Sequence, residues 1–369
     1  MKLKATLRLE NGLEFHGYSF GDTQAVCGEV VFNTSMMGYP EQLTDATYCG
    51  QILCLTYPLI GNYGVPSEEL AGEQLSKKLE SEKIQPKGLI IFDYCEDYSN
   101  WEAEKSLEQW MKEQGLTGIY GIDTRELTKV LRDKGSMKGS IIPEGAAAPA
   151  EAVKATPADV CCKEVITYAA QPAEHVENIN GSKAATTNGK KVVLVDCGTK
   201  HSIIRGLIAR GAEVIRVPFD YDFTSLEFDG VYVSNGPGCP CDCEKTVENL
   251  KKVLDGNKPV FGLGLGYHLI AKAAGCEMQK LQHPHRGANQ PVRREGSNRT
   301  YISAQNVCRT VKPSSIPSAW EVYFTNLNDG AVDGIRHTSK PFIGLNFHPE
   351  VCVGLTENVT PLDEFISKL

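Results

Sequence analysis

The chain has 369 residues, of which 41% are hydrophobic and 23% are charged, and its formal net charge is −8. These values are ordinary for a soluble globular protein, and the length suggests roughly two domains. The acidic balance and the lack of long Lys/Arg clusters exclude an extended nucleic-acid or anionic-membrane surface, and no apolar run approaches the ~18 residues of a membrane span.

Residues 1–21 alternate apolar and polar side chains and turn at Asn11-Gly12, which predicts a β-hairpin. The segment lacks the apolar core of a secretory signal and the Arg/Ser-rich character of a transit peptide. We therefore expect the thirteen cysteines to be free thiols in a reducing compartment, and we expect a cytoplasmic protein. A mitochondrial location would need a transit peptide outside this sequence.

The first part of the chain is rich in predicted strands. Two amphipathic helices are expected among them, one over 101–115 that ends at Gly115 and one over 123–135. Asp123 or Thr124 is the expected N-cap of the second helix. Strand-like runs stand at residues 28–36, 50–64 and 88–95.

Composition divides the chain into three parts. Residues 1–150 form a predicted strand-rich domain, and residues 151–190, rich in Ala and Pro and then in polar residues, form a predicted linker. Over residues 191–369 strands alternate with helices, which predicts an α/β fold with a parallel sheet covered by helices on both faces. Sites in such sheets gather at the carboxyl ends of the strands. Three glycine turns stand there, at 196–198, 235–238 and 262–266.

The stretch KPVFGLGLGYHLIAKAAG, residues 258–275, is predicted to form a buried strand, a glycine-dense turn and a helix. This layout is typical of a nucleophile elbow, but its tip carries Gly264 where such elbows carry Ser or Cys. Neither a dinucleotide fingerprint nor a P-loop matches the turn. Alternatively, Gly264 only allows a sharp reversal of the backbone at positive φ.

A second feature is the segment FIGLNFHPEV, a predicted strand followed by His348-Pro349-Glu350. In an extended segment residues i and i+2 point the same way, so His348 and Glu350 can act as a base and the carboxylate that orients it. A surface loop is the alternative for this segment taken alone. We expect His348 to face Gly264 across a small cleft, with Glu350 behind it.

Together these features resemble a known family. Residues 191–369 resemble a class I glutamine amidotransferase domain, and the whole chain resembles the small, glutaminase subunit of carbamoyl-phosphate synthetase. The amino-acid sequence of these segments is most similar to the animal versions, where this unit is fused to the synthetase. The resemblance is carried by GEVVFNTSMMGYPEQLTDATYCGQILCLTYPLIGNYG, YGIDTRELTKVLRDKGSMKGSI, VDCGTKHSIIRGLIARGAEV, SNGPG, RGANQPV, ISAQN and NFHPE.

The resemblance implies a site chemistry. In that family a Cys at the elbow attacks the amide of glutamine, the His of H-P-E takes its proton, and backbone N–H groups stabilise the oxyanion. The released ammonia passes to the large synthetase subunit. By position, Gly264 stands at the nucleophile site without its Cys, and His348 and Glu350 are the remaining catalytic members. Gly236 and Gly238 take the oxyanion side, and no cofactor is implied.

The glutamine pocket implied by the resemblance is altered at further positions. Thr47 replaces a Ser, His268 replaces a Gln, and Cys308 and Arg309 replace a small and an aromatic residue. The mitochondrial, ammonia-using animal synthetase also lacks the Cys. These dispersed changes indicate natural decay of the pocket, so glutamine is expected to bind weakly if at all. The implied substrate-binding residues are Thr47, Gly236, Gly238, Leu265, His268, Asn306, Cys308 and Arg309.

The alternative to an inactive glutaminase is a nucleophile displaced to another cysteine. Cys239, Cys241 and Cys243 lie beside the G-P-G turn, and Cys308 lies in the pocket segment. None of these cysteines stands on a predicted elbow. The C-x-C-x-C run also raises the question of a metal, but zinc sites usually use C-x2–4-C pairs, and no second Cys/His pair follows nearby. No metal site is predicted.

The predicted function is that of a carbamoyl-phosphate synthetase small-subunit component with an inactive glutaminase, a pseudoenzyme of pyrimidine or arginine biosynthesis. Its expected partner is a large ATP-grasp synthetase subunit or fused domain that takes free ammonia, with no nucleic acid and no membrane. Two alternatives stay open. One is a working glutaminase with a displaced Cys, and the other is a stand-alone binding protein of the same fold.

Overall fold

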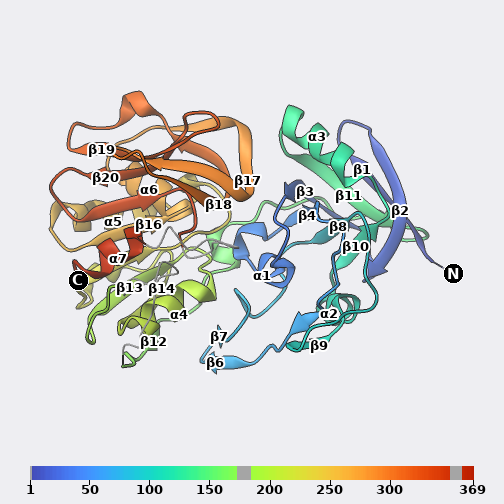
Figure 1. Cartoon of the computed structure of the whole chain (residues 1–369), viewed down its shortest axis with the longest axis horizontal. Coiled ribbons are helices and arrows are strands. Elements are labelled where there is room, and N and C mark those ends of the chain that lie inside the picture. The colour runs from blue at the N-terminus through green and yellow to red at the C-terminus, as the bar shows by residue number, and fades with distance from the viewer. Residues whose placement is uncertain (1, 173–183, 350–359) are drawn as a thin grey trace. The chain divides into compact units, whose positions relative to one another are not determined.

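The computed structural model describes residues 2–172, 184–349 and 360–369 (Figure 1). The chain divides into two compact units, residues 1–155 and 156–369. The first holds the strand-rich part of the sequence, and the second holds the alternating strands and helices. No helix in the described ranges has the length and apolar character needed to cross a membrane.

The first unit is a closed barrel of seven strands in the order β1-β11-β3-β4-β8-β10-β2. Strands β3, β4, β8 and β10 run parallel to one another, and the other neighbours in the barrel are antiparallel. The predicted N-terminal hairpin is present, because β1 pairs with β2 across a turn in which Gly12 has a φ of 85°. The strands are β1 (Lys4–Leu9), β2 (Glu14–Gly21), β3 (Val26–Asn33), β4 (Gln51–Leu55), β5 (Val65–Pro66), β6 (Leu70–Gly72), β7 (Leu75–Ser76), β8 (Gly88–Ile91), β9 (Ala103–Lys105), β10 (Thr117–Tyr120) and β11 (Met137–Pro143).

The helices of the first unit are α1 (Tyr39–Leu43), α2 (Leu107–Gln114) and α3 (Thr124–Lys134). Helix α3 is capped as predicted, since the Asp123 side chain accepts from the Glu126 amide over 2.8 Å. The predicted start of α2 at residue 101 was wrong. The Ser106 hydroxyl caps α2 by accepting from the Gln109 amide, and the three residues before it form β9, which pairs with β5.

The second unit is built on one ten-stranded sheet in the order β12-β14-β13-β15-β16-β21-β20-β18-β17-β19. The five strands from β14 to β21 are parallel, as the alternation of strands and helices predicts. An antiparallel extension that was not predicted continues through β20, β18, β17 and β19. The strands are β12 (Ile166–Tyr168), β13 (Lys191–Asp196), β14 (Glu213–Pro218), β15 (Gly230–Val233), β16 (Val260–Leu263), β17 (Met278–Arg294), β18 (Thr300–Val311), β19 (Trp320–Asn326), β20 (Val332–His337) and β21 (Phe342–Leu345).

Part of the segment predicted as a linker joins this sheet. Strand β12 pairs antiparallel with β14, with Ile166 opposite Arg216. The Cys162 amide donates to Oδ2 of Asp196 over 2.8 Å. Asp196 also forms a buried ion pair with Arg216, in which Nε lies 2.7 Å from Oδ2. The middle of the segment therefore belongs to the second unit.

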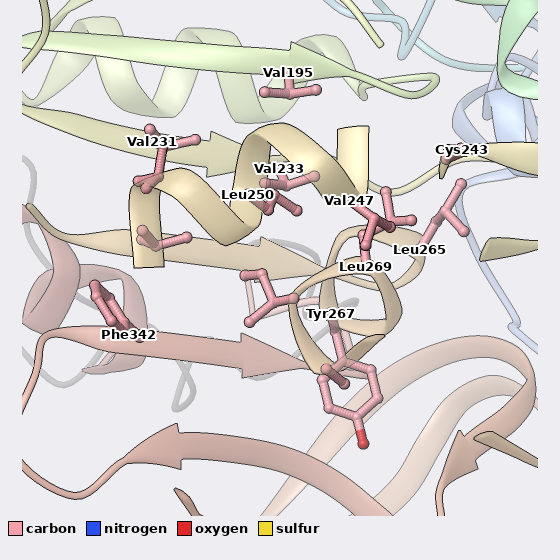
Figure 2. Packing of buried hydrophobic residues seen from close by; sticks show 14 of the residues in the cluster. Val195, Val231, Val233, Cys243, Val247, Leu250, Leu265, Tyr267, Leu269 and Phe342 are labelled. Carbon is pink, nitrogen blue, oxygen red and sulfur yellow. The ribbon is translucent and has the colours of Figure 1, made fainter. Parts of the chain in front are cut away.

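Helices cover both faces of the parallel strands. Helices α5 and α6 share one face, and Figure 2 shows Leu250 of α5 and Leu269 of α6 in the same apolar cluster as Val233 of β15. On the other face, the ring of Phe365 in α7 lies 5.7 Å from the ring of Phe261 in β16. The helices are α4 (His201–Ala209), α5 (Glu244–Asp255), α6 (Leu265–Ala273) and α7 (Thr360–Ile366).

Candidate functional site

Gly264 lies at the tip of the predicted strand–turn–helix. Strand β16 ends at Leu263 and α6 begins at Leu265. Between them Gly264 has φ 54° and ψ −110°, a conformation that strains a residue with a Cβ but not a glycine. The first N–H groups of α6, including that of Leu265, have no acceptor within the helix.

Two further glycines of the elbow allow close packing. A Cβ on Gly266 would lie 2.1 Å from the carbonyl oxygen of Val233, and a Cβ on Gly262 would lie 2.7 Å from the carbonyl oxygen of Gly266. The Gly266 amide donates to the carbonyl of Ser234 over 3.0 Å. The glycine-dense turn thus places α6 directly against the end of β15.

The turn after β15 flanks Gly264. A Cβ on Gly264 would lie 3.3 Å from the Cβ of Asn235, and a Cβ on Gly236 would lie 1.9 Å from the carbonyl oxygen of Cys197. Gly238 has a φ of 94°. Asn235 is 1% exposed, and within the described part of the chain its Oδ1 and Nδ2 have no hydrogen-bond partner. Since buried polar groups are normally bonded, this unpaired amide marks a polar site beside the elbow.

His348 is tied to the same end of the sheet. The Gly264 amide donates to the carbonyl of Leu345 over 2.9 Å, and Leu345 ends the strand that leads to His348. The His348 amide donates to the carbonyl of Ala304 in β18 over 3.0 Å, and His348 is buried. Glu350 lies outside the described residues, so its pairing with His348 stays a prediction.

His268 is bonded to β18. Its Nε2 lies 3.2 Å from the carbonyl oxygen of Arg309, which also accepts from Nδ2 of Asn346 over 3.0 Å. Burial lowers the pKa of His268 to about 4, so the ring is neutral at pH 7. Because its partner is a carbonyl oxygen, the ring proton is on Nε2. This hydrogen bond therefore links α6 to β18.

Strand β18 carries three of the predicted pocket residues. Asn306, Cys308 and Arg309 are half-buried along it. Arg286, which is itself buried, donates through Nη1 to Oδ1 of Asn306 over 2.8 Å. This bond fixes the orientation of the Asn306 amide, because Oδ1 must face the guanidinium. Arg286 was not predicted as a site residue, although it opens the RGANQPV stretch.

A buried polar network holds Gln305, the neighbour of Asn306. Nδ1 of His285 lies 2.8 Å from Oε1 of Gln305, and Nε2 of His285 lies 2.9 Å from Oδ2 of Asp329. Gln305 in turn donates through Nε2 to Oδ2 of Asp333 over 2.7 Å. Burial raises the pKa of the Asp333 carboxyl. The sequence offered no signal for this network beyond the ISAQN stretch that contains Gln305.

Thr47 is the one described candidate that belongs to the first unit. It lies in a single 3-10 turn (Ala46–Tyr48), and its hydroxyl donates to Oδ1 of Asp45 over 2.7 Å. The other described candidates belong to the second unit. They lie in the segments that follow β15, β16 and β21 and on β18.

Of the cysteines near the G-P-G turn, Cys243 is the most buried. Burial raises the pKa of the Cys243 thiol to about 12, so it stays protonated at pH 7 and is a weak nucleophile. Cys239 accepts a hydrogen bond through Sγ from the Cys241 amide over 3.4 Å. Among the described residues, no group of three or more His, Cys, Asp or Glu side chains is placed to hold a metal ion.

The arrangement has some of the parts that acyl transfer needs. Backbone N–H groups at the start of a helix and in a glycine turn are of the kind that stabilise an oxyanion. A histidine such as His348 is of the kind that accepts a proton. Gly264 has no side chain, so no covalent intermediate can form at the tip of the elbow.

Two family models match successive parts of the chain. Residues 7–141 match the family described as carbamoyl-phosphate synthase small chain, CPSase domain, and residues 193–368 match the family described as glutamine amidotransferase class-I. The chain is 42% identical over 365 residues to multifunctional protein CAD of Squalus acanthias, which covers 98% of this chain and 16% of that protein.

Two further relatives differ in length. The chain is 42% identical over 370 residues to the mitochondrial carbamoyl-phosphate synthase (ammonia) of Homo sapiens, covering 98% of this chain and 23% of that protein. It is 39% identical over 377 residues to the arginine-specific small chain of carbamoyl phosphate synthase from Candida albicans, covering 99% of this chain and 85% of that protein. The chain thus spans less than a quarter of the two long relatives and most of the small chain.

Proposed function

Since the chain belongs to the carbamoyl-phosphate synthase small-chain family, we propose that its own glutamine-hydrolysing site is degenerate and that it serves an ammonia-using synthetase as a structural or regulatory partner. The observation that carries this proposal is Gly264, which stands at the tip of the elbow and offers no nucleophile. Covalent amide hydrolysis at such a site needs a thiolate there.

The surroundings of Gly264 support the loss of glutamine turnover. His268 is buried and bonded to the carbonyl of Arg309. Cys243, a candidate for a displaced nucleophile, is held protonated by its burial, which raises the thiol pKa to about 12. Without a nucleophile, the remaining base and oxyanion donors give only a small residual acceleration.

Exposed apolar side chains in the first unit support the partner role. Strands β3, β4 and β8 are adjacent and parallel, so their carboxyl ends share one edge of the barrel. The segments that follow these strands expose Met36, Leu59 and Phe92, whose exposed fractions are 70%, 44% and 51%. We define the barrel-edge cluster as the exposed apolar residues of these three segments, Met36, Met37, Leu59, Phe92, Tyr98 and Trp101.

Hydrogen bonds join the three segments. The Cys95 amide donates to the carbonyl of Ile60 over 3.0 Å, and the Gly38 amide donates to the hydroxyl of Tyr63 over 2.8 Å. Trp101 is 93% exposed. Met and aromatic residues are enriched at protein interfaces, so these exposed side chains support an interface at this edge of the barrel.

We assign the barrel-edge cluster to a large ATP-grasp synthetase chain. One of the long relatives is named as an ammonia-using carbamoyl-phosphate synthase, and the short relative is named as a small chain. A subunit that lacks its own chemistry has to act through binding. A stable dock would bury about 1,200–2,000 Å² in total, for which the cluster would supply the apolar centre.

The test combines the chain with a large synthetase chain and measures carbamoyl phosphate formed from ATP, bicarbonate and either ammonium or glutamine. We expect the chain to raise the ammonium-dependent output and to leave the glutamine-dependent output at the level of the large chain alone. Glutamine-dependent output that disappears in His348→Ala would support a displaced thiol instead. No binding between the two chains would favour a stand-alone protein.

A further inference from the structure

A buried histidine that the proposed function does not use lies in the antiparallel part of the sheet of the second unit. His285 is on β17, and its ring contacts β18 and the turn between β19 and β20 (Figure 1). Nδ1 of His285 lies 2.8 Å from Oε1 of Gln305, and Nε2 lies 2.9 Å from Oδ2 of Asp329. The proton positions on the ring follow from these neighbours, because an amide oxygen and a carboxylate oxygen accept hydrogen bonds and cannot donate them.

The orientation of the Gln305 amide is fixed at its nitrogen end. Nε2 of Gln305 donates to Oδ2 of Asp333 over 2.7 Å and to the hydroxyl oxygen of Ser303 over 3.2 Å. The Ser303 hydroxyl gives its own hydrogen to the carbonyl of Gln290 over 3.0 Å, so its oxygen accepts from Gln305. A reversed amide would place Oε1 against a carboxylate oxygen and against a hydroxyl whose hydrogen is already used. Oε1 of Gln305 therefore faces His285.

Asp333 is the acceptor that decides this orientation. It is fully buried, and its Oδ2 also accepts from Nδ2 of Asn326 over 2.9 Å. The Asn326 amide is itself fixed, because its Oδ1 accepts from the Asn328 amide over 2.9 Å. Two N–H donors on one oxygen favour the ionised form of a carboxyl group. Burial raises the pKa of Asp333, and the charge on His285 acts in the opposite direction. A buried carboxylate needs such a counter-charge.

Both ring nitrogens of His285 therefore face acceptors. A neutral ring has one donor nitrogen and one acceptor nitrogen, so it would leave a lone pair 2.8 Å from Oε1 of Gln305 or 2.9 Å from Oδ2 of Asp329. Nδ2 of Asn326 is also near Nδ1 of His285, but at 3.3 Å, and it already donates to Asp333 over 2.9 Å. The shorter contact, to Gln305, decides in favour of a proton on Nδ1.

The backbone pairing around His285 is short. Residues 285–287 of β17 pair with β18, and the register between the two strands shifts on both sides of this segment. Arg286 lies within it and donates through Nη1 to Oδ1 of Asn306 over 2.8 Å. The side-chain bonds of His285 thus supplement a short backbone ladder at the place where Arg286 and Asn306 are held.

We propose that His285 is an imidazolium at pH 7 and a positioning residue for the strands that carry Arg286 and Asn306. Its two N–H groups hold Gln305 and Asp329, and its charge balances the buried carboxylate of Asp333. The other titratable group that faces Asp333 is the hydroxyl of Tyr267 in α6, whose pKa burial raises, so it stays neutral. The proposal does not depend on glutamine turnover, and its test can fail while the proposed function stands.

Nitrogen-15 NMR of the full chain with labelled histidine tests the charge, because protonated and unprotonated ring nitrogens differ in chemical shift. At pH 7 we expect two protonated nitrogens for His285. We expect one for His268, the buried neutral ring that serves as internal control. The signals lost in His285→Gln, or in His285→Asn where the first variant does not fold, identify His285. A His285 ring with a single protonated nitrogen at pH 7 would overturn the proposal.

Asp329→Asn removes the carboxylate at Nε2 and should leave His285 with one protonated nitrogen. Glu295→Gln is the matched control, because the side chains of Glu295 and Asp329 are 37% and 36% exposed and Glu295 bonds to the hydroxyl of Thr325 instead. Hydrogen–deuterium exchange of the backbone amides at 285–287 should be at least about tenfold faster in Asp329→Asn and unchanged in Glu295→Gln. Equal exchange in the two variants, or an imidazolium that survives in Asp329→Asn, would overturn the positioning role.

Discussion

The amide of Gly264 donates to the carbonyl oxygen of Leu345 over 2.9 Å, which ties the tip of the elbow to the strand that leads to His348. Gly264 therefore stands at the tip of a strand–turn–helix elbow that has no side chain at its tip. A Cys at this position would carry the strain of a φ of 54°. The missing Cβ leaves the tip without a nucleophile and also keeps this backbone conformation unstrained.

Gly264→Cys tests both consequences. We expect the free energy of unfolding to fall by about 1–3 kcal/mol, because the new Cβ would sit at positive φ and 3.3 Å from the Cβ of Asn235. Little glutamine hydrolysis should return, since His268 stays bonded to the carbonyl of Arg309. Urea unfolding and an ammonia-release assay measure the two effects.

Gly206→Ala is the control for this change. Gly206 lies within α4, and the nearest atom to its added Cβ is Nη1 of Arg210 at 3.7 Å. Because alanine suits a helix interior better than glycine, the free energy of unfolding should rise by about 0.5–1 kcal/mol. A Gly264→Cys variant as stable as the parent would show that the elbow is unstrained. Rapid glutamine hydrolysis by that variant would contradict the proposed decay of the pocket.

The fold could be predicted where local patterns agree with tertiary pairing. The parallel strands, the elbow and the Asp123 cap of α3 follow from alternation, glycine spacing and cap chemistry. Residues 103–105 have the pattern of the helix predicted there but pair with β5. Likewise, β12 is a three-residue strand that only its pairing with β14 defines. Such pairings depend on partners distant in the sequence.

The site could be predicted only in part, for a related reason. Gly264, His348 and His268 stand in stretches with a recognisable pattern. The bond from Arg286 to Asn306 joins residues 20 positions apart, and the contact between His285 and Asp329 spans 44 positions. Neither spacing has a local signature. Likewise, the Asn235 amide, which has no hydrogen-bond partner among the described residues, is recognised only when burial and bonding are both known.

The stability of the chain should fall as the pH drops from 6.5 toward 4. Burial holds the pKa of folded His268 at about 4, below the value of 6.5 for an exposed histidine. The unfolded chain then binds the proton first, so the stabilising contribution is complete above pH 6.5 and is lost as the pH falls to 4. This residue changes the free energy of unfolding by at most about 1.4 kcal/mol per pH unit. Urea unfolding at pH 7, 6 and 5 measures it.

His268→Gln isolates this contribution, because glutamine does not titrate. The slope of the free energy of unfolding against pH should become shallower without vanishing. Burial also lowers the pKa of His201, to about 3, and this residue gives a contribution of the same sign. Parallel pH profiles for the variant and the parent would show that His268 is not buried as a neutral ring. A profile that rises toward pH 5 would contradict the sign itself.

The buried pair of Asp196 and Arg216 should be sensitive to the removal of one partner. Arg216→Met leaves the Asp196 carboxylate buried, with bonds from the amides of Gly198 and Thr199 at 2.9 and 2.8 Å. Loss of the guanidinium should cost about 3–5 kcal/mol of unfolding free energy. Asp196→Asn combined with Arg216→Met should cost less than the sum of the single changes. Additive losses in urea unfolding would argue against direct coupling.

Docking through the barrel-edge cluster should depend on its most exposed members. Trp101 and Met36 are 93% and 70% exposed, so Trp101→Ser and Met36→Ser should leave the far-ultraviolet circular dichroism unchanged. Each should weaken binding to a large synthetase chain by at least about tenfold, because truncation of an interface anchor costs more than 1 kcal/mol. Leu13→Ser is the control, since Leu13 is 43% exposed in the β1–β2 turn. Calorimetric titration that finds equal affinity for all three variants would place the dock on another surface.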